Sequence, residues 1–470
     1  MGRIRSRLSL FRPERQLSQQ QLPHTWPAMV AFFLILLLAF GLRVYDLGNL
    51  TLYGDYAYSV YSARMDWAAI ALESSIDSHP PFYYYLLHIW MLVSGQNELT
   101  IRMLSAMIGV LVIPATYSLG VRHLDRRVGM LGSLLVAVSP SLVHYSRLPR
   151  MYGLLVLLGL LSIYTLTRAI ELDRRRDWLA FFITTSLLAY THYYGLALIA
   201  AEAAYYIWAK RSRAWRNVRS LATAGALAAV CLPWLFFAAK SSAAATARTI
   251  SNAPWPKDIA GILAQFWIPF NVGDFLSAKA SLALSLVMLG LWLTALYLER
   301  HHLLRRWRDV RFLVFSIAIP IVGSLIIFLV APYFVRPRFF IFCIPPYLLL
   351  LATVLSGKRR WLATAGVVTT LLVSSYALQD MYRVEPYYVE GDAIQLTDRI
   401  QQIAQPEDAV VFQAFWQIGY FTTHYRGAMP ATYSMRDLPL KDAEATLSRS
   451  PRVWLAMFRV PERTPEYRLE

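Results

Sequence analysis

The chain has 470 residues, of which 57% are hydrophobic and 16% are charged, and its formal net charge is +17. A typical soluble domain carries about 25% charged residues, so this composition excludes an ordinary soluble enzyme and a disordered chain. The basic residues stand between long apolar stretches, which favours an integral membrane protein and no nucleic-acid partner. Only two cysteines are present, Cys231 and Cys343, so a disulfide scaffold is excluded.

Eleven apolar windows are long enough to cross about 30 Å of hydrocarbon, which takes roughly 20 residues of helix. They are 26–44, 102–121, 128–145, 151–169, 178–194, 195–209, 220–239, 280–298, 311–331, 338–356 and 361–378. We therefore predict an α-helical polytopic membrane protein with about 11 transmembrane helices.

Lys and Arg predict that the N-terminus is cytoplasmic. In that orientation the inner segments hold 25 of them and the outer connections 11, as the positive-inside rule requires. Residues 1–25 are then a basic cytoplasmic tail. The window 26–44 is a retained span rather than a signal peptide, because no small-residue cleavage site follows before Arg43. An odd number of spans places the C-terminus outside.

Two outer regions flank or interrupt the predicted transmembrane module 26–378. The first outer loop, 46–100, contains two short amphipathic segments, 53–72 and 81–93, whose Trp and Tyr residues are typical of interfacial helices. The tail 379–470 has a net charge of −3. Its pattern predicts a helix near 394–403 and strands at 409–412 and 452–458, hence a small extracytoplasmic α/β domain.

Ionisable and aromatic residues gather in five segments on the predicted outer side, where a single cavity would collect them. A membrane enzyme keeps such groups within reach of water, because a bare charge in lipid costs several kcal/mol. The segments are Tyr53-Gly54-Asp55-Tyr56-Ala57-Tyr58-Ser59, Asp77-Ser78-His79-Pro80-Pro81-Phe82-Tyr83-Tyr84-Tyr85, Tyr145-Ser146-Arg147-Leu148-Pro149-Arg150-Met151-Tyr152, Thr191-His192-Tyr193-Tyr194-Gly195 and Arg336-Pro337-Arg338.

With these segments in this order, residues 26–380 resemble the GT-C glycosyltransferases of the bacterial protein O-mannosyltransferase and aminoarabinose transferase type (glycosyltransferase family 39-like). That family has Asp-Glu-Ala-Tyr and His-Pro-Pro in the first outer loop, then Tyr-Ser-Gln-Glu-Ala-Arg-Met-Tyr, Thr-His-Tyr-Tyr and Pro-Arg-Tyr. The matching residues are Asp55, Ala57, Tyr58, His79, Pro80, Pro81, Tyr83, Tyr84, Tyr145, Ser146, Arg150, Met151, Tyr152, Thr191, His192, Tyr193, Tyr194, Pro337 and Arg338.

The resemblance implies a hexosyl- or pentosyltransferase of the cell envelope. It would take a sugar from a polyprenyl-phosphate donor on the outer face and pass it, with inversion, to a hydroxyl of a lipid, glycan or protein acceptor. Two departures remove carboxylates: Tyr56 stands where the family has Glu, and Leu148-Pro149 where it has Glu-Ala. Asp55 is left as the principal candidate carboxylate.

Asp55 is the candidate general base, because transfer to a hydroxyl requires the proton to leave as the bond forms. Its structural alternative is an N-cap of a helix from Tyr56 to Trp67. Arg150 and Arg338 are the candidate clamp on the departing phosphate, since guanidinium groups bind phosphate oxygens bidentately. The alternative for both is anchoring of their spans at headgroup level.

Five further residues complete the candidate site. His79 would donate to the donor phosphate or orient Asp55, and its alternative is packing beside Pro80-Pro81. His192 and Tyr193 form a similar donor pair, although both residue types are common at membrane interfaces. The resemblance adds Tyr58 and Tyr152 as substrate contacts. Arg102 is interpreted as structural, and Glu202, inside an apolar window, has an open role.

No metal site and no cofactor are predicted, since there is no His-x-x-x-His, no Cys ligand set and no Gly-rich phosphate loop. A divalent cation held by Asp55 with Asp66 or Asp77 is the alternative if the first outer loop folds back. Two other functions stay open: a non-catalytic lipid-glycan binding protein or flippase on the same scaffold, and a polysaccharide polymerase or ligase that uses lipid diphosphate donors.

Overall fold

The computed structural model describes residues 26–50, 52, 54–76, 79–246, 259–273, 276–330, 336–384, 391–412, 415–427, 431–433 and 450–456. The chain divides into two compact units. The first, here called the bundle unit, contains Met1–Leu47, Arg102–Phe236 and Ser251–Glu385, and the second, the α/β unit, contains Gly48–Ile101, Phe237–Ile250 and Pro386–Glu470.

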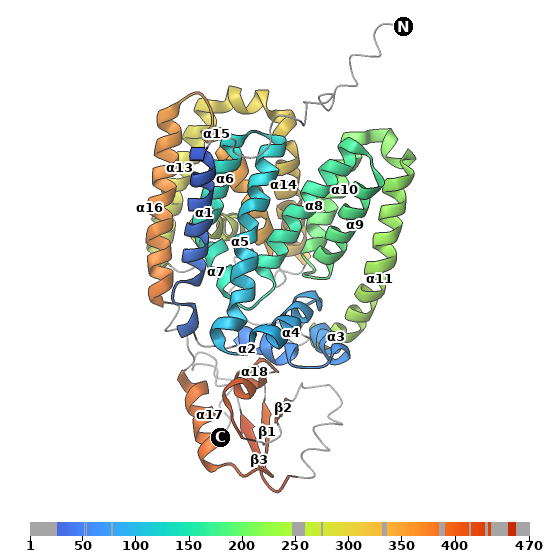
Figure 1. The fold of residues 1–470 in the computed structure, drawn as a ribbon, viewed down its shortest axis with the longest axis vertical. Helices are drawn as coiled ribbons and strands as arrows, with labels where there is room; N and C mark the ends of the chain where they lie inside the picture. Colours follow the sequence, from blue (N-terminus) through green and yellow to red (C-terminus); the bar gives the residue numbers. More distant parts are fainter. Residues whose placement is uncertain are drawn as a thin grey trace. The chain divides into compact units, whose positions relative to one another are not determined.

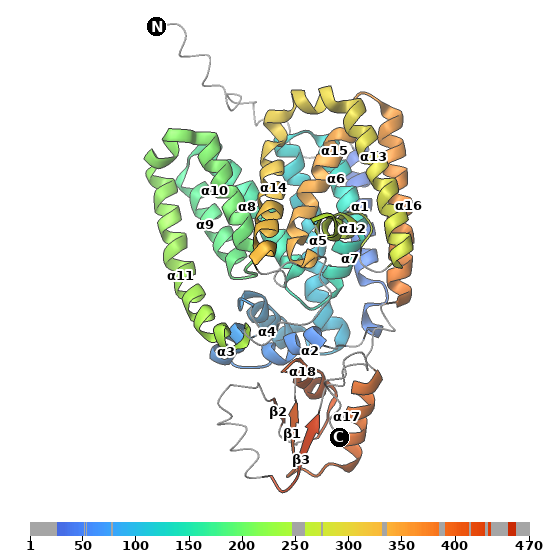
Figure 2. The same ribbon diagram turned by 180° about the vertical axis from the view of Figure 1, so that it is seen from behind.

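The bundle unit is helical throughout its described residues (Figures 1 and 2). The helices that lie wholly or mainly in it are α1 (Trp26–Val44), α5 (Glu98–His123), α6 (Arg126–Val138), α7 (Pro140–Arg147), α8 (Tyr152–Leu172), α9 (Arg175–Ala189), α10 (Gly195–Lys210), α11 (Val218–Thr246), α12 (Ile259–Asn271), α13 (Ala278–Arg305), α14 (Trp307–Val330), α15 (Ile344–Leu355) and α16 (Arg360–Val384), with 3-10 turns η3 (Arg211–Arg216) and η5 (Pro337–Cys343); the turn η2 (Leu47–Asn49) crosses the boundary between the units.

The helices confirm a multi-pass membrane protein but do not confirm eleven spans. Within the described ranges, eight helices are long and apolar enough to cross a membrane, or nine if the bent pair α6 and α7 is one span. The predicted windows 178–194 and 195–209 correspond to α9 and α10, which have only 15 and 16 residues. The exact number of crossings therefore stays a prediction.

The predicted span 128–145 is bent by 57° between α6 and α7. Asp125 starts α6, because its side chain accepts the Val128 N–H at 2.9 Å. Ser139 ends it in an extended conformation and is followed by Pro140, and the residue before a proline is disfavoured in the α region. Arg147 is the last residue of α7, so the bend sets the direction in which α7 leads into the turn that carries Arg150.

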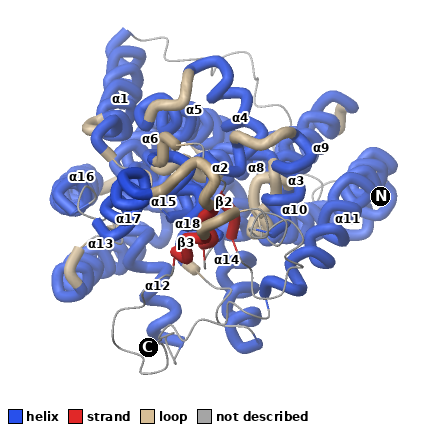
Figure 3. Tube along the Cα trace, turned by 90° about the horizontal axis from the view of Figure 1, so that it is seen from below, coloured by secondary structure: helices blue, strands red, loops and turns tan. Residues whose placement is uncertain are grey.

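The α/β unit combines helices of the first outer loop with the tail. The loop forms α2 (Gly54–Ala63), α3 (Trp67–Ile76) and α4 (Phe82–Ser94), and the tail forms α17 (Gly391–Ile403), β1 (Ala409–Phe412), α18 (Phe415–His424), β2 (Ala431–Tyr433) and β3 (Val453–Ala456). The sheet is parallel in the order β2-β1-β3, with Val410 opposite Ala431 and Trp454. Figure 3 shows the strands beside α18 and α2.

The first outer loop forms three described helices, so the prediction of two segments is wrong in this respect. The predicted segment 53–72 is broken after Ala63, and Asp66 caps the next helix: its Oδ1 accepts the N–H groups of Ala68 at 3.0 Å and Ala69 at 2.9 Å. An acceptor side chain at a helix start is worth about 1 kcal/mol. The break between α2 and α3 is therefore caused by the capping residue Asp66, which a search for hydrophobic periodicity does not detect.

The strands at 409–412 and 453–456 lie where the sequence predicts them, whereas α18 and β2 were missed. The tail also shares a hydrophobic core with the first outer loop. Tyr58 of α2 is buried in it together with residues of α17, β1, α18 and β3, namely Ile400, Val410, Phe412, Ile418, Phe421 and Ala456. The two outer regions, assigned to different domains from the sequence, thus belong to one unit.

Candidate functional site

The turn between α7 and α8 presents the predicted residues Arg150 and Tyr152. The Arg150 N–H donates to the Leu148 carbonyl at 2.7 Å, and the Ser105 hydroxyl donates to the Arg150 carbonyl at 3.4 Å. Leu148 at the end of α7 is extended, which Pro149 after it favours. The Leu148-Pro149 departure from the family pattern therefore makes a tight, buried turn.

Four arginines of the bundle unit surround this turn, and all four are almost completely buried: Arg43, Arg102, Arg147 and Arg150. Arg147 Nη1 donates to the carbonyls of Arg43 at 3.3 Å and Tyr45 at 2.6 Å, and Arg102 Nη1 donates to the Arg147 carbonyl at 3.1 Å. Buried cations are costly unless an anion or many acceptors compensate them. Four guanidinium groups are therefore gathered at this turn.

Arg43 was missed by the sequence reasoning. Its Nε donates to Ser146 Oγ at 3.3 Å, and its Nη1 donates to the carbonyls of Ala39 at 3.0 Å and Ala137 at 3.1 Å. Among the described residues, Nη2 finds no acceptor and no carboxylate pairs with this guanidinium. The sequence did indicate this residue: an arginine in the last turn of an apolar helix is costly in a membrane, so it either has a function or anchors the helix.

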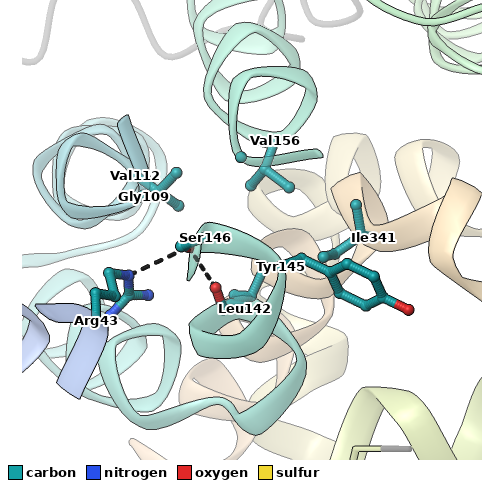
Figure 4. A pocket seen from close by; sticks show the side chains of 9 residues that line it. Arg43, Gly109, Val112, Leu142, Tyr145, Ser146, Val156 and Ile341 are labelled. Atoms are coloured by element: carbon teal, nitrogen blue, oxygen red, sulfur yellow. Dashed lines mark hydrogen bonds between the residues drawn. The ribbon is translucent and has the colours of Figure 1, made fainter. Parts of the chain in front are cut away.

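A small cavity of about 10 Å³ opens beside Arg43, large enough for roughly one water molecule. Figure 4 shows Arg43 and Ser146 joined on one side of it and Tyr145 pointing away from Arg43. Gly109 also lines it: a Cβ added there would lie 2.3 Å from Ser146 Oγ and 3.0 Å from Arg43 Nε. The close contact between α5 and the turn at residues 147–150, here called the arginine turn, therefore requires glycine at position 109.

Aromatic rings connect three of the predicted segments. The ring centroids of Tyr145 and Tyr152 are 5.0 Å apart, those of Tyr152 and His192 are 6.2 Å apart, and those of His192 and Phe339 are 5.1 Å apart. The Arg338 guanidinium lies 5.4 Å from the Phe339 ring centre. The structure thus places Tyr152, His192 and Arg338 in one neighbourhood, and their roles in a site stay a prediction.

His192 is buried, and its geometry selects a tautomer. Its Nδ1 accepts the Tyr194 N–H at 3.1 Å. In a neutral ring the proton is then on Nε2, which makes that atom a hydrogen-bond donor. Tyr193, the other member of the predicted donor pair, is half-buried in the same connection. This connection therefore supplies donors of the type that an anionic ligand needs.

The remaining predicted residues belong to the α/β unit. Asp55 is half-buried in the first turn of α2, one residue inside the helix rather than at its N-cap. A carboxylate in the first turn still interacts favourably with the helix dipole. His79 precedes α4, and its N–H donates to the Ser74 carbonyl at 3.0 Å. Tyr58 is fully buried and donates to Glu73, so it stabilises this unit, and its substrate contact stays a prediction.

Glu202 belongs to no carboxylate cluster that could hold a metal within the described ranges. Glu202 is buried between α8, α9 and α10, where its Oε2 accepts from Ser162 Oγ at 3.0 Å. No group of three His, Cys, Asp or Glu side chains in the described part of the chain is arranged to hold an ion. Of the three aspartates considered for a cation, Asp66 caps α3 and Asp77 lies outside the described residues.

The described helices define a polytopic membrane protein, and part of its sequence is similar to a known family. Residues 78–237 match the family model for dolichyl-phosphate-mannose-protein mannosyltransferase. This stretch contains His79, Arg150, Tyr152, His192 and Tyr193. No curated protein matches the chain in sequence.

Solved structures extend the likeness over most of the chain. The apo structure of ArnT from Cupriavidus metallidurans is 13% identical, covers 92% of this chain and 89% of its own, and gives a TM-score of 0.59. The same protein bound to undecaprenyl phosphate is 14% identical over 91% and 90%, also with a TM-score of 0.59. AglB from Archaeoglobus fulgidus, with an inhibitory peptide and a dolichol-phosphate, is 14% identical. The match covers 86% of this chain and 64% of AglB, with a TM-score of 0.50. The resemblance to the GT-C glycosyltransferases is confirmed at the level of the fold.

Proposed function

We propose that the protein is an inverting membrane glycosyltransferase that moves a hexosyl or pentosyl group from a polyprenyl-phosphate donor to a hydroxyl acceptor. The observation that supports this most is the cluster of four buried arginines at one turn of a bundle whose fold is similar to GT-C structures. Guanidinium groups bind phosphate oxygens bidentately, and a phosphate on a lipid chain also has a tail that suits a membrane. The ArnT structure with undecaprenyl phosphate shows that the same fold accepts such a lipid.

In the proposed reaction, an acceptor oxygen attacks the anomeric carbon from the face opposite the phosphate. The new carbon–oxygen bond forms as the bond to the phosphate oxygen breaks, so the configuration inverts. Asp55 takes the acceptor proton, and the electron pair of the broken bond remains on the lipid phosphate. Arg150, Arg338 and the donor groups of His79 and His192 stabilise that growing charge, which is usually the largest catalytic term.

Further parts of the proposal concern orientation. The N-terminus is cytoplasmic and the tail extracytoplasmic, so that donor and acceptor meet on the outer face. The 25 inner against 11 outer basic residues support this orientation. The acceptor is a lipid, a glycan or a protein. Reporter fusions at each end of the chain test the orientation directly.

A reconstituted assay tests the proposal. Purified protein in lipid nanodiscs is incubated with a panel of polyprenyl-phosphate sugars, and loss of sugar and release of lipid phosphate are measured. Asp55→Asn is expected to lower turnover by at least 100-fold while the donor still binds, because the amide cannot accept the proton. If Asp55→Asn leaves sugar translocation intact and no donor is consumed by the wild type, the alternative of a lipid-glycan binding protein or flippase is favoured.

A further inference from the structure

Helix α18 of the tail approaches α2 at backbone distance. Gly419 makes this possible: a Cβ added there would lie 2.4 Å from Tyr58 N, 2.5 Å from Tyr58 Cα and 2.6 Å from the Ala57 carbonyl carbon. Real side-chain carbons do not approach backbone atoms so closely, and here the neighbour is main chain that no rotamer change can move. Gly419 is therefore required for the observed register between the two helices.

Six of the ten residues of α2 are buried. Ala57, Tyr58 and Val60 are fully buried, and Tyr58 packs with Ile418 and Phe421 of α18 in the core of the α/β unit. On its other side, Tyr58 donates its hydroxyl proton to Glu73 of α3. Rotation of α2 would therefore break a hydrophobic cluster and a buried hydrogen bond together.

Polar contacts hold both ends of α2 to the tail. After its C-terminus, Arg64 Nη1 donates to the Thr422 carbonyl of α18 at 3.1 Å, and Arg64 Nε donates to Gln96 Oε1 at 3.0 Å. Before its N-terminus, the Leu52 N–H donates to Glu98, whose carboxylate lies 3.7 Å from His424 Nε2 at the end of α18. Position and rotation of α2 are both restrained.

We propose that α18 is a positioning element for the reaction: through Gly419 it sets the register of α2, and thereby the direction of Asp55. This inference rests on the proposed function of Asp55 as the base. It gives the tail a role in catalysis. A misplacement of about 1 Å is enough to slow an oriented reaction by about 100-fold.

Gly419→Ala tests this against a matched control in the same region. The added methyl group is expected to shift α2 and to lower kcat by 10- to 100-fold, with the donor KM within a factor of three of wild type. The control is Gly427→Ala, where a Cβ would meet the Tyr425 hydroxyl at 2.2 Å. This contact and that with Tyr425 Cζ at 2.4 Å involve one side-chain ring and no main chain, so the register of α2 is expected to be kept and kcat to stay at the wild-type value.

A second variant keeps the proposal testable if Gly419→Ala does not fold. Arg64 is exposed, so Arg64→Ala is tolerated and removes the tether to Thr422; kcat is expected to fall 3- to 10-fold, and Arg64→Lys to recover part of it. Hydrogen exchange of the α2 amides provides a readout that needs no turnover, with faster exchange expected in Gly419→Ala and Arg64→Ala.

The outcomes separate this inference from the proposed function. Wild-type kcat in both Gly419→Ala and Arg64→Ala overturns the positioning role, even if Asp55→Asn is inactive. Equal loss in Gly419→Ala and Gly427→Ala overturns it as well, because the effect is then general to the tail. If the wild type transfers no sugar, the proposed function fails, and unchanged α2 exchange in the variants would show that the restraint by α18 fails independently.

Discussion

Substitution of Gly109 by alanine tests whether the arginine turn is as tightly packed as its geometry indicates. The added Cβ would lie 2.3 Å from Ser146 Oγ, 2.5 Å from Ser146 Cβ and 3.0 Å from Arg43 Nε. Overpacking of this kind costs about 1–3 kcal/mol. Displacing Ser146 also removes an acceptor of a buried guanidinium, a hydrogen bond worth about 1.5–3 kcal/mol.

The opposing gain is small, since alanine in a helix is favoured over glycine by about 0.5–1 kcal/mol. We therefore expect Gly109→Ala to be destabilised by about 2–5 kcal/mol and to lose donor affinity. Gly225→Ala in α11, where an added Cβ meets nothing within 4 Å, should be neutral or slightly stabilised. Thermal unfolding in detergent and binding of an undecaprenyl-phosphate probe measure the two effects.

A compensating pair of substitutions checks the cause. Ser146→Gly removes both atoms that the new methyl group would strike, so Gly109→Ala with Ser146→Gly should be more stable than Gly109→Ala alone. The reasoning is refuted if Gly109→Ala unfolds at the same temperature as Gly225→Ala, or if the double variant is no more stable than the single one.

Two other predictions concern packing and pH. Gly120→Ala should be destabilised more than Gly132→Ala in a thermal melt, because the first added Cβ would lie 2.6 Å from the backbone of Gly129 and the second would meet only the end of a leucine side chain; equal melting temperatures would contradict this. Hydrogen bonds from Arg452 lower the pKa of Asp408 from its usual value to about 2. Because the folded pKa is the lower one, this stabilisation is complete above about pH 4 and is lost as the pH falls toward 2. Near-ultraviolet circular dichroism between pH 5 and 2 should therefore show a smaller acid transition for Asp408→Asn than for the wild type, and an identical transition would argue against the role of this carboxylate.

Some residues of the candidate site could be singled out in the sequence because they are charged or polar among apolar neighbours. Arg150 and Arg338 are charged groups beside apolar helices, and such residues are costly in a membrane unless they bind something. His192 could be singled out because it is a polar residue in a short aromatic connection between two apolar windows. Arg43 is likewise a charged residue at the end of an apolar helix, but it was interpreted only as one of the basic residues that flank the spans.

Other features were not predictable because they depend on contacts between distant segments. Nothing local distinguishes Gly109 or Gly419 from the other glycines of the chain, since each matters only through the backbone or side chain that faces it. Tyr58 belongs to a family-like motif, yet its neighbours are Ile400 and Phe421, more than 300 positions away. The contacts of Tyr58 with these two residues exist only because α18 and α17 pack against α2 in the folded chain.

The sequence alone determined that this is a multi-pass helical membrane protein with charged groups at its predicted outer ends, because hydropathy and the cost of charge in lipid act on each segment separately. It also determined two of the three strands described in the tail, from local alternation. The tertiary structure alone decided that the first outer loop and the tail share one core, that α6 and α7 bend, and that Arg43 supports the arginine turn. These features depend on close packing between segments remote in the chain, which no local pattern encodes.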